Sequence, residues 1–191
     1  MKHEATPGLA TRAGPAALAA RQETLLSATG ISLTGPGAEN AVRHLAIDAL
    51  TSRRNRVVLS RSDARRLFGI DADTLREERI PGLALTDDSE HTRNLLARHA
   101  SSQNVLVSCT DEVEEFRRSS AHHRGDLTIV TTSPGPGPSA NISADGHVLL
   151  NTTSCPLPDW VPLLSTSGAF TQLMSMPTLA CQPPASTVIH N

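Results

Sequence analysis

Short apolar runs alternate with helix-compatible segments along most of this chain, and this alternation constrains the fold more than any other feature. The runs are rich in Val, Ile and Leu, and they lie at residues 30–34, 56–60, 83–86, 104–108 and 126–132. Strands separated by helices are joined by right-handed crossovers and form a mainly parallel sheet. The sequence therefore predicts an α/β domain with helices on both faces of the sheet, Rossmann-like or degenerate P-loop-like in type.

The helical segments carry their own signals. The strongest periodicity places apolar residues three and four positions apart, at Ala38, Ala41, Val42, Leu45, Ala46, Ala49 and Leu50. Ser62 and Asp63 predict the start of a second helix, and Gly69 predicts its end. Asp87 and Glu90 have the spacing of a capping box, which predicts a third helix that runs to about residue 100.

The pattern changes after residue 133. A turn rich in Pro and Gly at 134–138 leads to two short runs at 140–143 and 147–150, which flank the turn sequence Ala144-Asp145-Gly146. This arrangement predicts a C-terminal β-hairpin that adds an antiparallel edge to the sheet. Prolines interrupt every later run, so that only residues 165–176 can form a short helix.

These boundaries divide the chain into three parts. Residues 1–14 lack apolar periodicity, and we expect a disordered N-terminus there. Residues 15–151 are expected to form a single α/β domain. Residues 152–191 are an extension rich in Pro, Ser and Thr, for which we expect partial disorder.

Charge and composition argue against several classes of partner. The formal net charge is -2 at pH 7, the only lysine is Lys2, and Tyr is absent. With a slightly negative net charge and few rings for base stacking, the chain is not expected to bind nucleic acid. No apolar run approaches the roughly 18 residues that span a bilayer, so we expect a cytoplasmic chain without membrane insertion. The cysteines are expected to be free thiols, and Cys109 is expected to lie in the core.

Glycines follow the first predicted strand at Gly35-Pro36-Gly37, where an α/β protein could hold a nucleotide. A loop for phosphoryl transfer has a lysine and a hydroxyl residue after its last glycine, whereas this chain continues with Ala-Glu. A weaker alternative is an anion or nucleotide site made by Gly35, Gly37 and Ala38 at the helix start, with Arg61 supplying positive charge. A tight strand-to-helix turn that requires glycine explains the same residues without any ligand.

No other set of residues identifies a reaction. His91 and His99, and the adjacent His122 and His123, lack the i, i+4 spacing that brings two imidazoles to one metal ion. No nucleophile lies on a Gly-x-Ser-x-Gly elbow. We therefore predict no catalytic residue, no metal site and no cofactor, which favours a non-catalytic chain over an enzyme.

Any pocket should lie where the parallel strands end, because ligands of open α/β sheets bind at the carboxyl edge. The residues that follow the predicted strands at this edge are 35–37, 60–63, 87–88, 110–111 and 132–133. Most of them are Gly, Ser, Thr and Asp. The acidic pairs are expected to cap helices, because the helix dipole favours carboxylates at a helix start.

Five short motifs occur in an order that resembles one family. They are Leu33-Thr34-Gly35-Pro36-Gly37-Ala38, Asp63-Ala64-Arg65-Arg66-Leu67-Phe68-Gly69, Pro81-Gly82-Leu83, Thr86-Asp87-Asp88 and Ala144-Asp145-Gly146. Over about residues 28–150 the chain resembles an α/β domain of actinobacterial regulatory proteins, large membrane-anchored chains that carry lysin-motif and bacterial transcriptional activator domains. The resemblance implies a non-catalytic α/β module and supplies no active-site residues. Because this sequence has no room for the transmembrane, lysin-motif and activator parts of those chains, we expect a stand-alone relative.

The expected function follows from the missing catalytic groups and from this resemblance. We expect a binding or regulatory module that contacts another protein in transcriptional or envelope signalling. The alternative is the degenerate nucleotide or anion binder. An exposed apolar patch made by Trp160, Val161, Leu163 and Leu164 would favour a protein partner, whereas docking of these residues on their own sheet would count against it.

Overall fold

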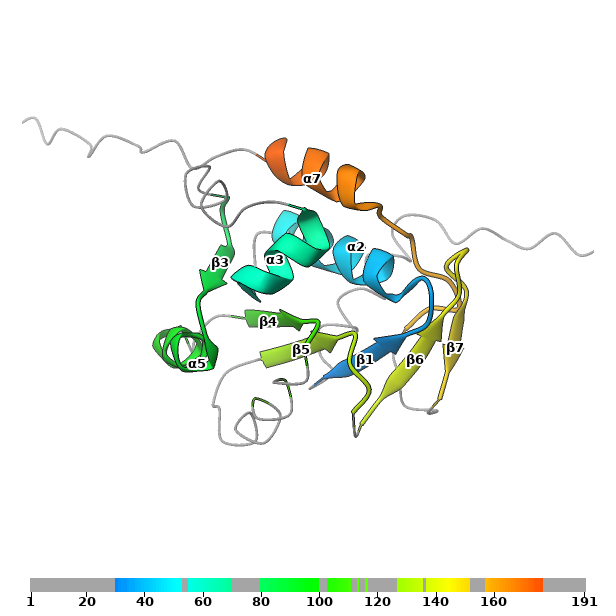
Figure 1. Cartoon of the computed structure of the whole chain (residues 1–191), viewed down its shortest axis with the longest axis horizontal. Coiled ribbons are helices and arrows are strands. Elements are labelled where there is room, and N and C mark those ends of the chain that lie inside the picture. Colours follow the sequence, from blue (N-terminus) through cyan, green and yellow to red (C-terminus); the bar gives the residue numbers. More distant parts are fainter. Residues whose placement is uncertain are drawn as a thin grey trace, which may run out of the picture.

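An open, seven-stranded sheet forms the centre of the molecule (Figure 1). The structure is a computed structural model that describes residues 30–52, 55–69, 80–99, 103–110, 113, 116, 127–135, 137–151 and 157–176. The strands are β1 (Ile31–Thr34), β2 (Asn55–Ser60), β3 (Leu83–Thr86), β4 (Gln103–Ser108), β5 (Leu127–Thr131), β6 (Ser139–Ile142) and β7 (Val148–Leu150). The helices within the described ranges are α2 (Ala38–Thr51), α3 (Arg61–Phe68), α5 (Ser89–Arg98) and α7 (Thr166–Met174).

The strand order is β3-β2-β4-β5-β1-β6-β7. All neighbouring strands are parallel except β6 and β7, which form an antiparallel hairpin. The predicted α/β fold with a C-terminal edge hairpin is therefore confirmed. In the dinucleotide-binding order the first strand lies beside the second, whereas here β1 lies between β5 and β6.

The helices cover both faces of the sheet because the chain reverses its direction across it. The chain moves from β1 to β2 and then to β3, and α2 and α3 lie on one face (Figure 1). It then returns to β4 and β5, and the opposite face is covered by Leu96 of α5 together with Val113 and Phe116. Right-handed crossovers require this change of face when the direction reverses.

Helices α2 and α3 are joined by a buried charged residue. Arg43 on α2 is only 6% exposed, and its Nε donates a hydrogen bond to the carbonyl oxygen of Leu67 on α3. Glu39, one turn earlier, forms ion pairs with Arg43 at 3.2 Å and with Arg66 at 2.7 Å. The buried guanidinium is thus paired and hydrogen-bonded, as the cost of burying a charge requires.

The segment 157–176 belongs to the folded core, although the sequence analysis placed it in the C-terminal extension. Leu157 and Val161 are buried in the core, and α7 buries Ala169 and Leu173, one turn apart, against α2 and α3. The amide of Leu164 donates to the carbonyl of Asn40 at 3.1 Å. The predicted disorder at residues 1–14 and the remainder of the extension lie outside the described residues.

The caps of two helices differ from the predicted ones by one or two residues. Helix α3 begins at Arg61, and Ser60, not Ser62, is its N-cap, since the Ser60 hydroxyl accepts the Asp63 amide at 3.0 Å. Helix α5 is capped by Asp88 and not by Asp87. The Asp88 carboxylate accepts a hydrogen bond from the His91 amide at 2.7 Å. An N-cap needs an extended backbone, which Ser60 and Asp88 have. The predicted end of α3 at Gly69 is confirmed.

The glycine turn after β1 packs directly against the end of β6. A Cβ atom on Gly37 would lie 2.1 Å from the carbonyl oxygen of Ser143, and one on Gly35 would lie 2.6 Å from that of Ile142. Gly35 also has a φ of 92°, which other residues rarely adopt. Both glycines are therefore required by the close approach of two backbones.

Replacing Gly37 with Ala is expected to destabilise the protein by about 2–3 kcal/mol, because backbone atoms of the β6 end would have to move. The unfolding temperature should fall by roughly 5–10 °C in a thermal melt. The control is Gly168→Ala in α7, where an added Cβ approaches only side chains of Leu164 and Ser165. This control should melt at or slightly above the parent temperature, and equal losses in both variants would contradict the assignment.

Candidate functional site

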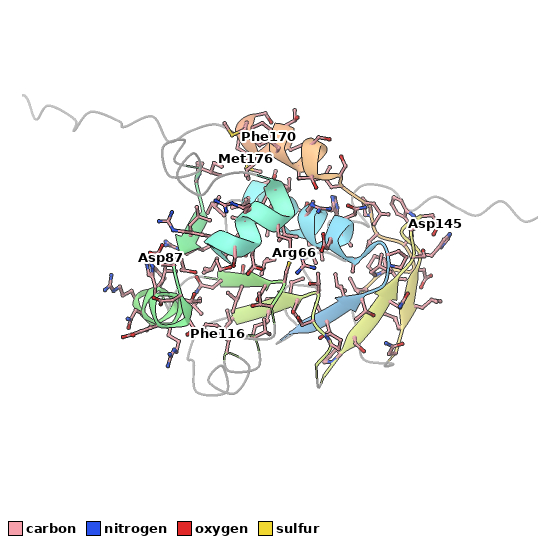
Figure 2. All side chains as sticks on the ribbon, viewed as in Figure 1. Arg66, Asp87, Phe116, Asp145, Phe170 and Met176 are labelled. Atoms are coloured by element: carbon pink, nitrogen blue, oxygen red, sulfur yellow. The ribbon has the colours of Figure 1, made fainter. Side chains whose placement is uncertain are left out.

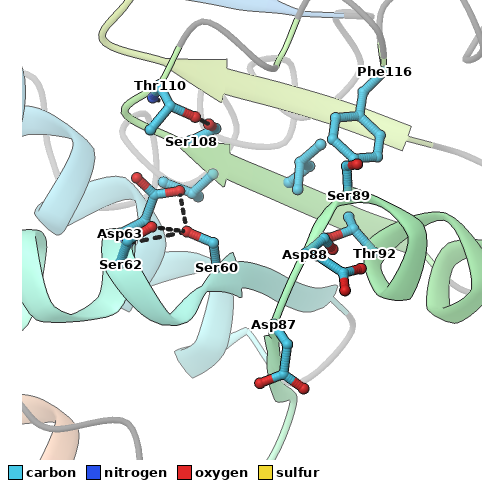
Figure 3. Close-up of a pocket in the computed structure, with 12 residues that line it drawn as sticks. Ser60, Ser62, Asp63, Asp87, Asp88, Ser89, Thr92, Ser108, Thr110 and Phe116 are labelled. Carbon is cyan, nitrogen blue, oxygen red and sulfur yellow. Dashed lines mark hydrogen bonds between the residues drawn. The ribbon is translucent and has the colours of Figure 1, made fainter.

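A pocket of about 200 Å³ opens at the carboxyl edge of the sheet, between the ends of β3, β2 and β4 (Figure 3). It is lined by Ser60, Ser62, Asp63, Asp87, Asp88, Ser89, Thr92, Leu106, Val107, Ser108, Thr110 and Phe116. The chain leaves β2 toward one face of the sheet and leaves β3 and β4 toward the other, which opens a crevice. The predicted location of a pocket is confirmed for three of the five strand ends.

Asp63 holds the two central strands of this pocket together. Its side chain is buried, and Oδ1 accepts the backbone amide of Cys109, after β4, at 3.0 Å. Its Oδ2 accepts the hydroxyl of Ser60, at the end of β2, at 2.8 Å (Figure 3). Both carboxylate oxygens are therefore engaged within the chain, and Asp63 has the geometry of a structural residue.

The two other aspartates of the pocket are also engaged. Asp88 caps α5 through the His91 amide, as described above. Asp87 pairs with the Arg61 side chain, and its Oδ2 lies 3.3 Å from His91 Nδ1. Figure 3 shows its carboxylate turned away from Ser60 and Asp63. Capping accounts for Asp88, as the sequence predicts, whereas Asp87 forms surface ion pairs in place of the predicted cap.

The chemistry of the pocket disfavours a phosphate ligand. Among the described residues that line it, three are aspartates and none is Lys or Arg. The carboxylates would repel an anion at the helix starts that otherwise favour one. Within the described ranges, no group of three His, Cys, Asp or Glu side chains is arranged to hold a metal ion.

The structure does not bring the four residues of the predicted anion site together. The Gly37 amide donates to the Ile142 carbonyl at 3.0 Å, and the Ala38 amide donates to the Gly35 carbonyl at 3.1 Å. Arg61 follows β2, which is three strand positions from β1, or roughly 14 Å at the usual spacing. Its side chain pairs with Asp87, beyond β2 on the side away from β1. The geometry therefore gives this alternative no support.

Cys109 lies at the same edge but is not an activated nucleophile. It is a free thiol, buried as the sequence predicts. Burial, and then the nearby Asp63 carboxylate, raise the pKa of the Cys109 thiol to about 11. A thiol with a raised pKa is a poor nucleophile near neutral pH because little of it is ionised.

The β6–β7 hairpin presents a second candidate site, on the outer edge of the sheet. Asp145, His147, Leu149 and Trp160, here named the hairpin surface, have exposed side chains, and Trp160 is 47% exposed. Trp160 is bridged to His147 in antiparallel register, so that the two side chains share a face. Leu149, two residues after His147, lies on that face as well.

Hydrogen bonds fix the exposed tryptophan in place. Trp160 Nε1 donates to the carbonyl oxygen of Asp145 at 2.8 Å. The amides of Val148 and Val161 join the Trp160 segment to the hairpin, each at 2.9 Å. The indole lies against Gly146, where an added Cβ would be 2.9 Å from Nε1. Trp160 is thus an ordered aromatic side chain on the surface.

The apolar patch that would have favoured a protein partner does not form, and the docking of three of its four residues on their own domain counts against that function. Val161 is buried, and Leu163 and Leu164 pack against the core, so only Trp160 stays exposed. Sequence reasoning missed Leu149, which is 65% exposed. Strand alternation could have found it, because Val148 faces the core and its neighbour must point outward.

No protein-family model, curated protein or solved structure matches this chain. None of the helices in the described part of the chain is long and apolar enough to cross a membrane. The geometry of the two candidate sites is therefore the structural basis for the proposal that follows.

ATP, GTP and sulfate are expected to leave the unfolding temperature unchanged, because the turn amides are bonded within the chain and the pocket is acidic. A ligand at about 100 times its dissociation constant would stabilise the fold by about 2.7 kcal/mol, or several degrees. A thermal-shift titration measures this directly. A rise in unfolding temperature with a nucleotide that disappears in Arg61→Ala would contradict the prediction and support the anion site.

Cys109 is expected to resist alkylation in the folded protein. With Cys155 and Cys181 replaced by Ser, iodoacetamide labelling near pH 8 should be at least about 100-fold slower in the native than in the denatured state, since a pKa of about 11 leaves little thiolate. Mass spectrometry over time gives both rates. Equal rates in the two states would show an accessible, reactive thiol.

Proposed function

We propose that this chain is a cytoplasmic, non-catalytic binding module that contacts another protein through the hairpin surface. The observation that carries the proposal is Trp160, the one tryptophan of the chain, which is hydrogen-bonded in place and yet nearly half exposed. Tryptophan is enriched among the few residues that dominate the binding energy of protein interfaces.

The order of this surface supports the same function. A side chain that is already fixed loses little conformational entropy when a partner covers it. Leu149 lies on the same face and extends the apolar contact beyond a single ring. Exposed Leu and Trp side chains together cost solubility, and a partner that covers them explains why they are there.

The carboxyl edge of the sheet supports a binding role over a catalytic one. Asp63 uses both carboxylate oxygens to join β2 and β4, and Asp88 caps a helix. The Cys109 thiol is buried with a raised pKa. These three side chains lie in or beside the pocket, and their contacts serve the fold.

The setting of the module is proposed from the sequence resemblance. The motifs that resemble regulatory chains with lysin-motif and transcriptional activator domains favour a role in transcriptional or envelope signalling. The turn Ala144-Asp145-Gly146 is one of these motifs, and it holds the hairpin surface in shape.

Photo-crosslinking tests the proposed contact in the native cell. A benzoylphenylalanine at position 149 should yield a discrete adduct of higher mass, and one at the exposed Arg93 of α5 should not. Adding Trp160→Ala should reduce the adduct at position 149 by about tenfold or more, the loss expected for an interface anchor. No adduct at 149, or the same adducts at both positions, would overturn the proposal.

A further inference from the structure

We infer that the partner presents an arginine to the hairpin surface, with its guanidinium group stacked on Trp160 and paired with the Asp145 carboxylate. This inference rests on the proposed function and names the chemistry of the partner. The two groups are held together, because Trp160 Nε1 donates to the main-chain oxygen of Asp145 itself.

The Asp145 carboxylate is exposed and oriented. Its side chain is 69% exposed, and the hydroxyl of Ser143 donates a hydrogen bond to Oδ1. That hydroxyl holds the pKa of Asp145 below its usual range, so the group is charged at neutral pH. Its Oδ2 lies 3.6 Å from His147 Nε2, which leaves this oxygen within reach of a ligand from solvent. Figure 2 shows Asp145 at the tip of the hairpin, far from Asp87 at the opposite side of the sheet.

The charge around the hairpin complements a cation. No Lys or Arg follows Arg124 in the sequence, whereas Asp145 and Asp159 both lie at this edge. The exposed Asp159 joins the hairpin through its carbonyl oxygen, which accepts the Val148 amide. The described arginines lie on α2, β2, α3 and α5, and Arg43, the arginine of α2, is buried and bonded to Leu67 of α3. A cationic segment would therefore meet attraction from these carboxylates, with the His147 imidazole as a neighbour 3.6 Å from Asp145 Oδ2.

The combination of a ring and a carboxylate favours Arg over Lys. The planar guanidinium group stacks on an aromatic face and forms two parallel hydrogen bonds to a carboxylate at its edge. An ammonium group is a more strongly hydrated point charge and gains less from the ring. Leu149 can receive the aliphatic part of the arginine or an apolar neighbour.

The test uses a fluorescein-labelled peptide in which arginines alternate with Gly, Ser and Leu, and a second peptide in which lysine replaces every arginine. Fluorescence anisotropy with the full chain gives both affinities. The arginine peptide should bind at least about threefold more tightly than the lysine peptide. Because Trp160 is the one tryptophan, its emission should change as the arginine peptide binds.

Three variants separate the stacked geometry from general attraction. Trp160→Ala should lower the affinity for the arginine peptide at least about fivefold, and Asp145→Asn should lower it about two- to fivefold. Glu90→Gln, which removes an exposed carboxylate of α5, should leave the affinity unchanged. Circular dichroism checks that each variant remains folded. If Trp160→Ala does not fold, Asp145→Asn still decides the test.

Two results would overturn the inference. One is equal affinity for the arginine and lysine peptides, or no binding of either. The other is an equal loss in Glu90→Gln and Asp145→Asn, which would indicate attraction by the overall charge. A crosslink at position 149 without arginine-peptide binding would refute this inference alone, whereas absence of that crosslink would remove the proposed function as well.

Discussion

The close contact between the glycine turn and the end of β6 is the constraint on which the rest of the structure depends. With glycine at positions 35 and 37, the backbone after β1 approaches the carbonyl groups of Ile142 and Ser143. This contact fixes the hairpin on the sheet and also uses the Gly37 amide. In a phosphate-binding loop that amide faces the ligand. The glycine turn, which resembles a nucleotide-binding loop, therefore packs against the β6–β7 hairpin and holds it on the sheet.

Charge is distributed to match this arrangement. Arg43 of α2 and Arg66 of α3 both form ion pairs with Glu39, which joins the two helices, and Arg43 is buried there. At the carboxyl edge, Asp63 ties β4 to β2. The charges of the Glu39 network and of Asp63 are therefore paired or hydrogen-bonded within the domain. The exposed carboxylate of Asp145 is held by a hydroxyl but faces solvent, which is where charge can act on a partner.

The sequence predicted the strands and helices well, because short apolar runs and helical periodicity are local signals. It predicted the pocket edge because the carboxyl ends of parallel strands are set by topology alone. It did not predict the strand order or the docking of α7, since both depend on contacts between residues far apart in the chain. The caps of α3 and α5 were misplaced because neighbouring Ser and Asp residues compete for the same role, and backbone angles decide between them. The sequence left the exposure of the patch around Trp160 open for a similar reason, because burial of Leu163 and Leu164 depends on the core they pack against.

The hairpin edge is an exposed surface whose side chains are held in place by hydrogen bonds. An edge strand offers unpaired backbone groups and is a hazard for aggregation. Here the Trp160 segment pairs with Gly146–Val148 and covers part of that edge. The Trp160 segment leaves the indole ring and the Asp145 carboxylate exposed to solvent. A ligand would therefore meet side chains here and not unpaired strand backbone. A ring and a carboxylate on a rigid support select a flat cation, whereas bare strand backbone would accept any extended chain.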